Sequence, residues 1–442
     1  MTRISEWRRL PISLNELCLA TTLRCGQSFR WRQCDDQTWA CTLRGRIVQL
    51  SQPDKSHIQY RSIWPASATA TAAPATFEAP LTPPSSVPPT AVSDEECCTK
   101  TAIEDGGDGD DTRSLIQHYL NLELNLETLY AQWSASDVNF RKKAPQFTGV
   151  RILRQDAWEA LVGFICSSNN NIIRISQMVD KLCTHYGTYI GTLEGQPYHD
   201  FPEPSALTGK NVENHLRELG FGYRAKYIYQ TAKIIAEDRE VGWLDTLRNP
   251  ESPAYGTTEP SPAGEMKPEG RDGYRQAHEN LLELQGVGPK VADCVCLMGL
   301  GWGEAVPVDT HVWQIAQRDY KLGKGRNSTM TKGTYDAVAN HFRKIWGKEA
   351  GWAHSVLFTA DLRTFAERLT TRVEVKVEKG EGDGKGKGDD EQEQKVVRKK
   401  TAQRVSLKRD PEQDEFKTVM HIEEETTTTT TLSERVKRRR RK

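Results

Sequence analysis

The sequence predicts an α+β protein in which an N-terminal antiparallel β-sheet domain precedes a mostly α-helical region. Residues 1–64 alternate apolar and polar side chains, most clearly in 37–43 and 46–50, and a period of two is typical of half-buried strands. Further along the chain the apolar residues follow helical periods, most clearly in 157–165 and 172–186. Strands that come before the helices, rather than alternating with them, indicate a fold in which the two are segregated.

Composition divides the 442-residue chain into three parts. We expect a β-rich domain over 1–150, a helical region over 151–371 and a disordered tail with a basic C-terminus over 372–442. Two stretches have the composition of insertions: 65–112 is rich in Ala, Thr, Pro and Ser and then in acidic residues, and 249–273 is rich in Pro, Gly and Glu. Such stretches bury too little apolar surface to fold, so we expect both to be disordered.

Residues 284–312 hold the pattern that points to chemistry. Gly286 and Gly288 form a glycine hairpin directly before Pro289 and Lys290, and an apolar run of helical length follows. Glycines leave backbone N–H groups exposed, and proline suits the first helical position. The free N–H groups and the positive end of the helix dipole form an anion site that suits a DNA phosphate.

Lys290 lies in the first turn of this predicted helix, where the dipole disfavours an ammonium, and a neutral lysine amine is a nucleophile that forms Schiff bases. Asp309 follows nineteen residues later, at the N-cap of a predicted helix 311–320. If the chain brings this carboxylate close to the amine, it can stabilise the positive charge that develops on a sugar during a reaction. Cys294 and Met298 are four and eight residues beyond Lys290, so the three share one helix face that would line a pocket.

Each of these signals also has a structural interpretation. A GxG before a helix is a weak motif, and a first-turn lysine is usually a solvated surface residue. Asp309 serves as a helix cap with or without chemistry, and Cys294 and Met298 are residue types common in cores. The joint spacing favours the catalytic interpretation, because core packing and capping do not require a lysine and an aspartate at these two places.

This spacing resembles that of the helix–hairpin–helix DNA glycosylases, and within that superfamily it is most similar to the eukaryotic 8-oxoguanine DNA glycosylases. The resemblance covers most of residues 5–65 and 113–366, and it implies that the helical region is a helix–hairpin–helix glycosylase core. The blocks that carry it, in the family's order, are LRCGQSFRW (23–31), FICSSNNNI (164–172), LGFGYRAKY (219–227) and GWAHSVLF (351–358).

The resemblance implies an enzyme that flips a damaged base out of duplex DNA and excises it, since the target atom is out of reach inside a duplex. Lys290 would attack the anomeric carbon and form a Schiff base, from which β-elimination follows, and Asp309 would stabilise the positive charge. Gly26 would read 8-oxoguanine through its carbonyl, which accepts from an N7–H that normal guanine lacks. Cys294 and Phe358 would sandwich the flipped base.

The resemblance also implies DNA contacts outside the base pocket. Residues that would hold the orphaned cytosine, fill the gap or contact the DNA backbone are Asn169, Arg174, Tyr223, Arg224, Gly286, Gly288 and His311. One position departs from the family, because His354 stands where a glutamine usually reads the Watson–Crick edge of the lesion. Histidine donates and accepts with a different geometry and a titratable ring, so the departure bears on lesion preference and leaves the glycosylase chemistry unaffected.

Charge and cysteine usage narrow the range of partners and cofactors. The formal net charge is zero, but residues 94–111 carry eight carboxylates and one lysine, which leaves 59 basic against 52 acidic residues elsewhere and favours a DNA partner. The ten cysteines show no zinc or disulfide pattern, and none follows Cys296, where iron–sulfur members of the superfamily carry a four-cysteine cluster. We expect no metal or cofactor in catalysis, and the family suggests a structural cation at the hairpin carbonyls.

The expected partner is damaged double-stranded DNA, bound by a monomer with no iron–sulfur cluster and no membrane span. The basic end, 435–442, favours nuclear import, and a mitochondrial fraction remains open. Two alternatives remain. One is a helix–hairpin–helix glycosylase for another lesion, and the other is a non-catalytic DNA-binding module. Lys290 together with Asp309 argues against the second, because gripping a phosphate requires no carboxylate.

Overall fold

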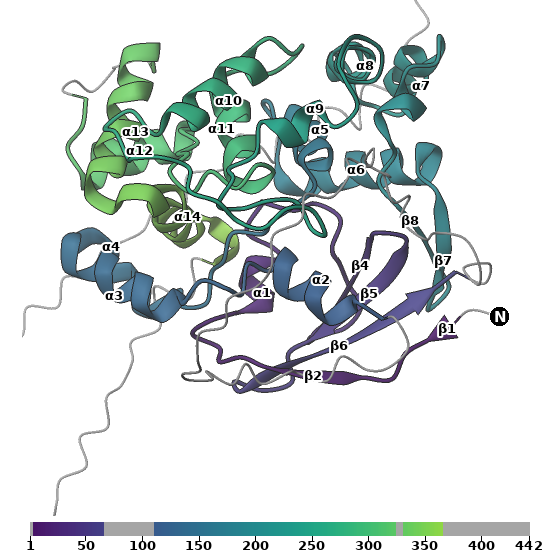
Figure 1. The fold of residues 1–442 in the computed structure, drawn as a ribbon, viewed down its shortest axis with the longest axis horizontal. Coiled ribbons are helices and arrows are strands. Elements are labelled where there is room, and N and C mark those ends of the chain that lie inside the picture. Colours follow the sequence, from purple (N-terminus) through teal and green to yellow (C-terminus); the bar gives the residue numbers. More distant parts are fainter. Residues whose placement is uncertain (1–2, 66–109, 324–329, 366–442) are drawn as a thin grey trace, which may run out of the picture. The chain divides into compact units, whose positions relative to one another are not determined.

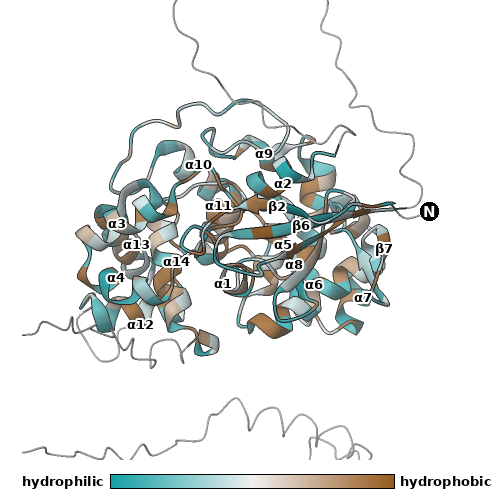
Figure 2. Ribbon diagram, turned by 90° about the horizontal axis from the view of Figure 1, so that it is seen from below, coloured by the Kyte–Doolittle hydropathy of each residue, from teal (hydrophilic) through white to brown (hydrophobic). Residues whose placement is uncertain are grey.

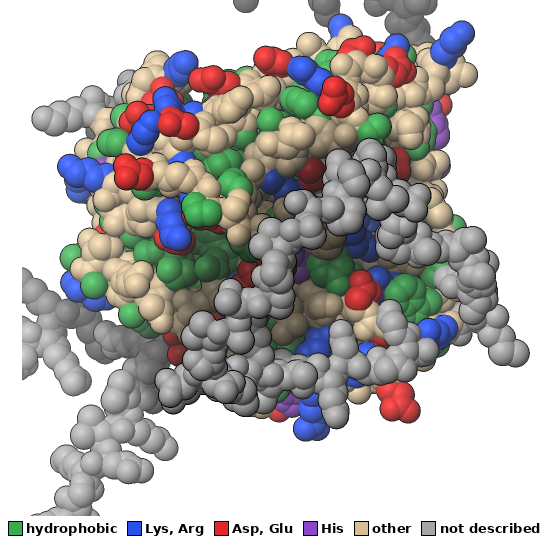
Figure 3. Space-filling view, viewed as in Figure 1, with side chains coloured by type: hydrophobic (Ala, Val, Ile, Leu, Met, Phe, Trp, Pro, Cys, Tyr) green, Lys and Arg blue, Asp and Glu red, His purple; other side chains and the backbone are tan. Residues whose placement is uncertain are grey.

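The computed structural model describes residues 3–65, 110–323 and 330–365 (Figure 1). Most of the first predicted insertion and the whole predicted tail with its basic end lie outside the described residues. None of the helices in the described ranges has both the length and the apolar character needed to cross a bilayer. On the face shown in Figure 3, Lys and Arg side chains are interspersed with Asp and Glu on the described surface, so charge is not segregated there.

The N-terminal part is an antiparallel sheet, which confirms the prediction from the alternating pattern. The strand order is β1-β6-β5-β4-β3, and β2 also pairs with β6. Buried and less buried side chains alternate along β6, and Figure 2 shows the matching alternation of brown and teal on β2 and β6. One face therefore packs on α1 and α2. The strands are β1 Arg3–Ile4, β2 Arg8–Pro11, β3 Arg32–Gln33, β4 Thr38–Leu43, β5 Arg46–Ser51 and β6 His57–Trp64.

The rest of the described chain is mainly helical, and most of its buried apolar side chains from α3 to α14 form one hydrophobic core. The helices predicted at 157–165 and 172–186 are confirmed as α5 and α6, each capped by the side chain just before it, Asp156 and Asn171. The helices are α1 Leu19–Thr22, α2 Thr112–Tyr119, α3 Leu126–Ser136, α4 Val138–Lys143, α5 Ala157–Cys166, α6 Ile172–Tyr186, α7 Val212–Glu218, α8 Arg224–Lys233, α9 Trp243–Thr246, α10 Asp272–Leu282, α11 Pro289–Met298, α12 Thr310–Asp319, α13 Lys332–Trp346 and α14 Ala350–Asp361. Short 3-10 or π turns lie at Ala144–Gln146, Pro204–Leu207, Ile234–Asp238, Gly347–Glu349 and Arg363–Phe365.

A β-hairpin that the sequence reading did not predict interrupts the helical region. Its strands are β7 Tyr189–Leu193 and β8 Gln196–His199, which pair antiparallel. Ile190 and Tyr198 pack against Ile47 of the main sheet and its neighbours. The hairpin therefore extends the contact between the sheet and the helices, and Figure 1 shows it beside the sheet.

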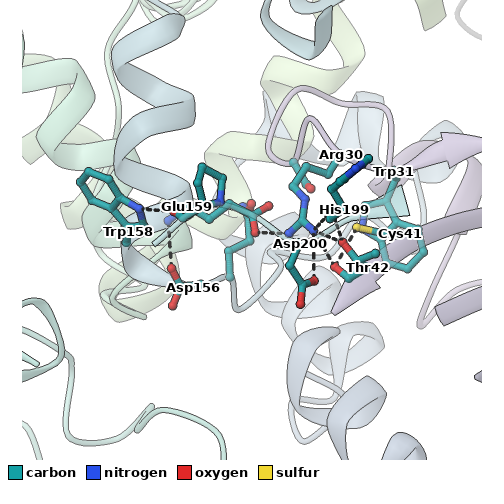
Figure 4. Close-up of polar contacts among 12 residues, drawn as sticks. Arg30, Trp31, Cys41, Thr42, Asp156, Trp158, Glu159, His199 and Asp200 are labelled. Carbon is teal, nitrogen blue, oxygen red and sulfur yellow. Dashed lines mark hydrogen bonds and ion pairs between the residues drawn. The ribbon is translucent and has the colours of Figure 1, made fainter. Parts of the chain in front are cut away.

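The sheet, α5 and the segment after β8 meet at the buried side chain of Arg30 (Figure 4). Its guanidinium donates to Glu159 at 2.6 Å and to the Thr42 carbonyl at 2.9 Å, and lies 3.7 Å from Asp200. Burial raises the pKa of the Glu159 carboxyl, and the charge of Arg30 opposes that shift. This cation thus joins three parts of the chain that are far apart in the sequence.

Residues 249–273 differ from the prediction of a disordered insertion. The buried Asn249 side chain donates to the Gly301 carbonyl at 2.9 Å. Arg271 forms a buried ion pair with Glu304, whose carboxylate is fully buried, at 2.9 Å. Composition did not reveal this order, because the prediction considered only apolar burial. The segment is held by hydrogen bonds and ion pairs instead.

Candidate active site

The glycine hairpin lies between α10 and α11, as predicted. Gly286 has a φ of +77°, and a Cβ there would lie 2.7 Å from Tyr227 Cβ. The backbone angle and the close approach of α8 therefore both require glycine. Gly288 is the N-cap of α11 and Pro289 is its first residue, so Lys290 lies in the first turn. This turn sets the direction of the lysine side chain.

The Lys290 amine is held against the end of α5. Its Nζ donates to Ser167 Oγ at 3.2 Å and lies 5.1 Å from the centroid of the Phe164 ring. The hydroxyl lone pairs and the negative face of the ring both attract its N–H groups. The Lys290 side chain is half-buried, so it is not the fully solvated surface lysine that the alternative interpretation of the sequence expected.

Asp309 caps α12, which begins one residue before the predicted start. Its carboxylate accepts from the Val312 N–H at 2.9 Å. The preceding Val306 and Val308 are fully buried, so this segment runs through the core and returns the carboxylate toward α11. The Asp309 side chain therefore caps α12 and also lies in the same pocket as Lys290.

The predicted catalytic and base-pocket residues meet in one pocket. An apolar wall with a few polar groups is typical of a site for a flat ring. Its lining includes all seven residues predicted for it: Gly26, Lys290, Cys294, Met298, Asp309, His354 and Phe358. The sequence reasoning missed eight further lining residues: Cys25, Gln27, Ile152, Phe164, Pro307, Val312, Ser355 and Thr359.

Gln27 fixes the loop that brings Gly26 to the pocket. Its Nε2 donates to the Arg151 carbonyl at 2.7 Å, and its Oε1 accepts from the Leu153 N–H at 2.9 Å. Gly26 has a φ of +83°, and a Cβ there would lie 2.9 Å from Ile172 Cδ1. A buried amide and a tight contact with α6 therefore set the backbone at Gly26. The block 23–31 contained this glutamine, but its partners are about 125 residues away and left no local signal.

His354 is a buried polar residue in the pocket wall. It is 5% exposed, and neither ring nitrogen is paired within the described part of the chain. Burial lowers the pKa of His354 to about 4, although the charge of Asp309 acts in the opposite direction. The ring is therefore neutral at pH 7. Since an unpaired buried polar group costs free energy, this ring is available to a bound base.

Cys294 contributes a protonated thiol to the pocket. Burial raises its pKa to about 11, and the positive charge of Lys290 opposes that shift. Burial likewise raises the pKa of Cys25 to about 11. Both sulfurs are thus neutral, polarisable wall atoms at pH 7 rather than thiolate nucleophiles.

Three of the predicted DNA-contact residues lie together outside the pocket. Arg224 is 3% exposed and donates through Nη2 to the Asn169 carbonyl at 3.0 Å, and Nη2 also donates to the Ser168 carbonyl. Tyr223 is 48% exposed, and its hydroxyl donates to the Ser168 carbonyl at 3.0 Å. The loop after α5 thus connects these residues to Ser167, the partner of Lys290.

The remaining predicted contacts lie on separate elements. Arg174 is exposed in the first turn of α6, and His311 is exposed on α12 with its ring centroid 6.2 Å from that of Phe358. Gly286 and Gly288 are at the hairpin itself. Among the described residues, no group of three or more His, Cys, Asp or Glu side chains has an arrangement suited to a metal ion.

Two family models match consecutive parts of the chain. "8-oxoguanine DNA glycosylase, N-terminal domain" matches residues 9–161, and "HhH-GPD superfamily base excision DNA repair protein" matches 162–347. An N-glycosylase/DNA lyase of Saccharomyces cerevisiae is 36% identical over 382 residues, which cover 83% of this chain and 89% of the yeast protein. The chain belongs to the 8-oxoguanine DNA glycosylase family. The glycosylase is also 32% identical to N-glycosylase/DNA lyase OGG1 of Arabidopsis thaliana over 364 residues, 82% of each chain.

Solved structures confirm the predicted fold class of the glycosylase. The apo 8-oxoguanine glycosylase/lyase of Clostridium acetobutylicum aligns with a TM-score of 0.57 at 20% identity and covers 81% of this chain and 98% of that one. The 3-methyladenine DNA glycosylase of Archaeoglobus fulgidus aligns with a TM-score of 0.52 at 17% identity and covers 80% and 98%. Proteins named for two different bases share this fold, so the choice of base depends on the pocket residues.

Proposed function

We propose that this glycosylase excises 8-oxoguanine opposite cytosine from duplex DNA and then cleaves the strand as a lyase. The observation that carries the proposal is the meeting of Lys290 and Asp309 in one pocket with Gly26, Cys294 and Phe358. Family membership and the names of the relatives support both activities.

Lys290 acts as the nucleophile. After losing a proton its amine attacks C1′ of the flipped nucleotide, the C1′–N9 bond breaks, and the base leaves with the bonding electrons and takes up a proton. Positive charge develops on the sugar in this step, and the Asp309 carboxylate stabilises it. Fixing the amine and the carboxylate in one pocket before the reaction lowers the entropic cost of the encounter.

The lyase step follows from the covalent intermediate. The sugar ring opens as the nitrogen of Lys290 forms a C=N bond with C1′, which gives the Schiff base. Loss of a proton from C2′ then breaks the C3′–O bond, and the 3′ phosphate leaves with that electron pair. Water hydrolyses the C=N bond and restores the amine. The step requires no oxidant, reductant or metal.

Base recognition uses the pocket walls. The Gly26 carbonyl accepts from the N7–H of 8-oxoguanine, while Cys294 and Phe358 pack on the two faces of the ring and Met298 lies on the same helix face as Cys294. Normal guanine would leave the Gly26 carbonyl unpaired, which is the kind of loss that discriminates strongly. His354 offers one nitrogen to the edge of the base.

The contacts to DNA lie around this pocket. Asn169, Arg174 and Arg224 hold the cytosine on the opposite strand, and Tyr223 fills the space that the flipped base leaves. The remaining contacts go to the DNA backbone: the N–H groups at Gly286 and Gly288, a structural cation at the hairpin carbonyls, and His311. The protein acts as a monomer, and it acts in the nucleus, a location that the basic cluster 435–442 supports.

A second candidate substrate is another damaged base, and the unpaired ring of His354 is the observation that favours it. A carboxamide can face a base edge with a donor and an acceptor side by side, whereas an imidazole offers a single nitrogen to that edge. Relative excision rates of 8-oxoguanine and other oxidised or alkylated bases in one duplex context distinguish the two candidates.

Borohydride trapping tests the main proposal. We expect a covalent adduct on duplexes with 8-oxoguanine opposite cytosine and none on undamaged duplexes. Lys290→Gln replaces the amine with an uncharged amide on a side chain one atom shorter, so it should bind the lesion and form no adduct. The matched control is Lys332→Gln, since Lys332 is exposed in the first turn of α13 and lies outside the pocket.

Normal excision by Lys290→Gln would refute the mechanism. An adduct on an abasic duplex alone would show that the amine is active but that the pocket selects another base, which would support the second candidate. An adduct lost equally in Lys332→Gln would point to impaired DNA binding and away from Schiff-base chemistry.

A further inference from the structure

The loop 167–171 between α5 and α6 contacts two parts of the proposed machinery. At its first residue, Ser167, it holds the Lys290 amine. One residue later, its backbone is held by Tyr223 and Arg224, which are proposed to contact the opposite strand. The side chain that reads the opposite base and the amine that attacks the lesion are therefore joined through one or two peptide units.

The Ser167 hydroxyl is oriented toward the amine. Its own proton goes to the Phe164 carbonyl at 2.7 Å, so only its lone pairs are left for the Lys290 N–H at 3.2 Å. The ring of Phe164 attracts the same amine from 5.1 Å. The last turn of α5 thus fixes the direction of the amine through one hydroxyl and one aromatic ring.

Carbonyl groups of the loop, one and two residues after Ser167, hold the Arg224 guanidinium. Its Nη2 donates to the carbonyls of Ser168 and Asn169, and its Nε is buried with no hydrogen-bond partner in the described chain. Carbonyls are weaker partners for a guanidinium than a carboxylate. A nucleobase acceptor can therefore compete for Arg224.

The backbone of this loop includes a residue in the left-handed region. Asn169 has a φ of +49°, which asparagine tolerates better than most residues other than glycine. Its carbonyl and that of Ser168 lose a donor whenever Arg224 turns toward DNA. A change of bonding at Arg224 is thus expected to move the loop, and Ser167 moves with it.

We propose that Ser167 is a positioning residue for Lys290, through which the base opposite the lesion sets the orientation of the amine. The inference rests on the proposed function and deepens it. Cytosine offers two acceptors, N3 and O2, to Arg224, and adenine offers a different edge. With cytosine opposite the lesion, the loop therefore places Ser167 so that the Lys290 amine is oriented for attack. With adenine opposite the lesion, the loop orients the amine less well.

Single-turnover excision of 8-oxoguanine opposite cytosine and opposite adenine tests this inference, with the dissociation constant of each duplex measured alongside. We expect Ser167→Ala to slow excision opposite cytosine about tenfold, as the loss of one hydrogen bond allows. Its affinity for DNA should be unchanged, and the ratio of the cytosine rate to the adenine rate should fall toward one. Ser167→Thr retains the hydroxyl and should restore rate and ratio.

Ser136→Ala is the matched control. Ser136 ends α3, and its hydroxyl donates to the carbonyl three residues earlier, as that of Ser167 does. This variant should match the wild type in both rates, and thermal melting should show both alanine variants folded.

A rate ratio that survives Ser167→Ala overturns the inference, and so does a wild-type rate that is the same opposite both bases. A ratio that falls in Ser167→Ala and is not restored in Ser167→Thr also overturns it, because a hydroxyl contact would then not be the cause. Absence of 8-oxoguanine excision by the wild type is a separate result that refutes the proposed function.

Discussion

The Asp309 carboxylate accepts a hydrogen bond from the Val312 N–H at 2.9 Å and at the same time lines the pocket that contains Lys290. One oxygen of the carboxylate is thus used to begin α12. The cap fixes the side chain in one orientation, so the group that meets positive charge on the sugar is already in place before DNA binds.

Asp309→Asn separates the two roles of this side chain. The amide oxygen of asparagine still accepts from the Val312 N–H, so the free energy of unfolding should remain within a few tenths of a kcal/mol. The negative charge is lost, so single-turnover excision should slow by roughly 100-fold or more. Urea unfolding and excision on one duplex measure both effects.

Asp309→Ala provides the comparison, since it removes the cap together with the charge. We expect it to lower the free energy of unfolding by about 1 kcal/mol and to slow excision as much as asparagine does. If asparagine destabilised the protein as much as alanine while excision stayed fast, capping would be the whole role of Asp309.

The sequence was most informative where function requires residues at fixed spacing along the chain. Gly286, Lys290, Cys294 and Met298 lie within about three helical turns of each other, so local geometry alone predicted which of them share a face. The pocket contains all of these except the hairpin glycine, together with Asp309. Helical periodicity likewise predicted the starts of α5 and α6, and the N-cap role of Asp309 predicted the start of α12 to within one residue.

The sequence was least informative where distant segments hold one another. Gln27 binds the backbone near residue 152, and nothing in the neighbourhood of either segment signals the other. The segment 249–273 has the composition of a disordered insertion, yet Arg271 and Asn249 anchor it to the 301–304 turn. Polar anchors of this kind depend on the fold already being formed, so composition cannot reveal them.

Gly26→Ala should impair excision through the backbone. A Cβ at a φ of +83° is strained by about 1–2 kcal/mol and would lie 2.9 Å from Ile172 Cδ1. The loop must move to relieve the contact, and the carbonyl that is proposed to read the N7–H moves with it. Single-turnover rates on 8-oxoguanine should fall more than rates of cleavage at a preformed abasic site, which requires no base reading.

The double variant Gly26→Ala with Ile172→Ala tests the steric part of that effect. Removing the Ile172 side chain clears the contact but leaves the strained φ, so the double variant should recover stability only in part. A Gly26→Ala variant that excises 8-oxoguanine at the wild-type rate would contradict the role of this backbone position.

Arg271→Met should destabilise the protein strongly. It leaves the fully buried Glu304 carboxylate without its partner, and such unpaired charges cost roughly 3–5 kcal/mol. Replacing both residues, as Arg271→Met with Glu304→Leu, removes the charge as well and should recover most of the loss. Denaturant unfolding of the three proteins measures the difference, and equal stability of Arg271→Met and the wild type would show that the pair contributes little.

His354 should make the folded protein sensitive to mild acid. Burial lowers its pKa to about 4 from an ordinary value of 6.5, so between these pH values the unfolded chain binds a proton that the folded chain excludes. Stability contributed by the neutral ring is therefore complete above pH 6.5 and decreases as the pH falls toward 4. The decrease at pH 5 is roughly 2 kcal/mol.

His354→Gln removes this proton linkage and supplies a side chain that does not titrate. The measurement is the free energy of unfolding by urea at pH 5, 6 and 7 for both proteins, compared as a difference so that other titrating groups cancel. We expect the wild type to lose roughly 2 kcal/mol more than the variant between pH 7 and pH 5. Parallel pH dependence of the two proteins would mean that the ring takes up its proton as readily in the folded pocket as in water, and His354 would then face a base as a mixture of neutral and charged forms.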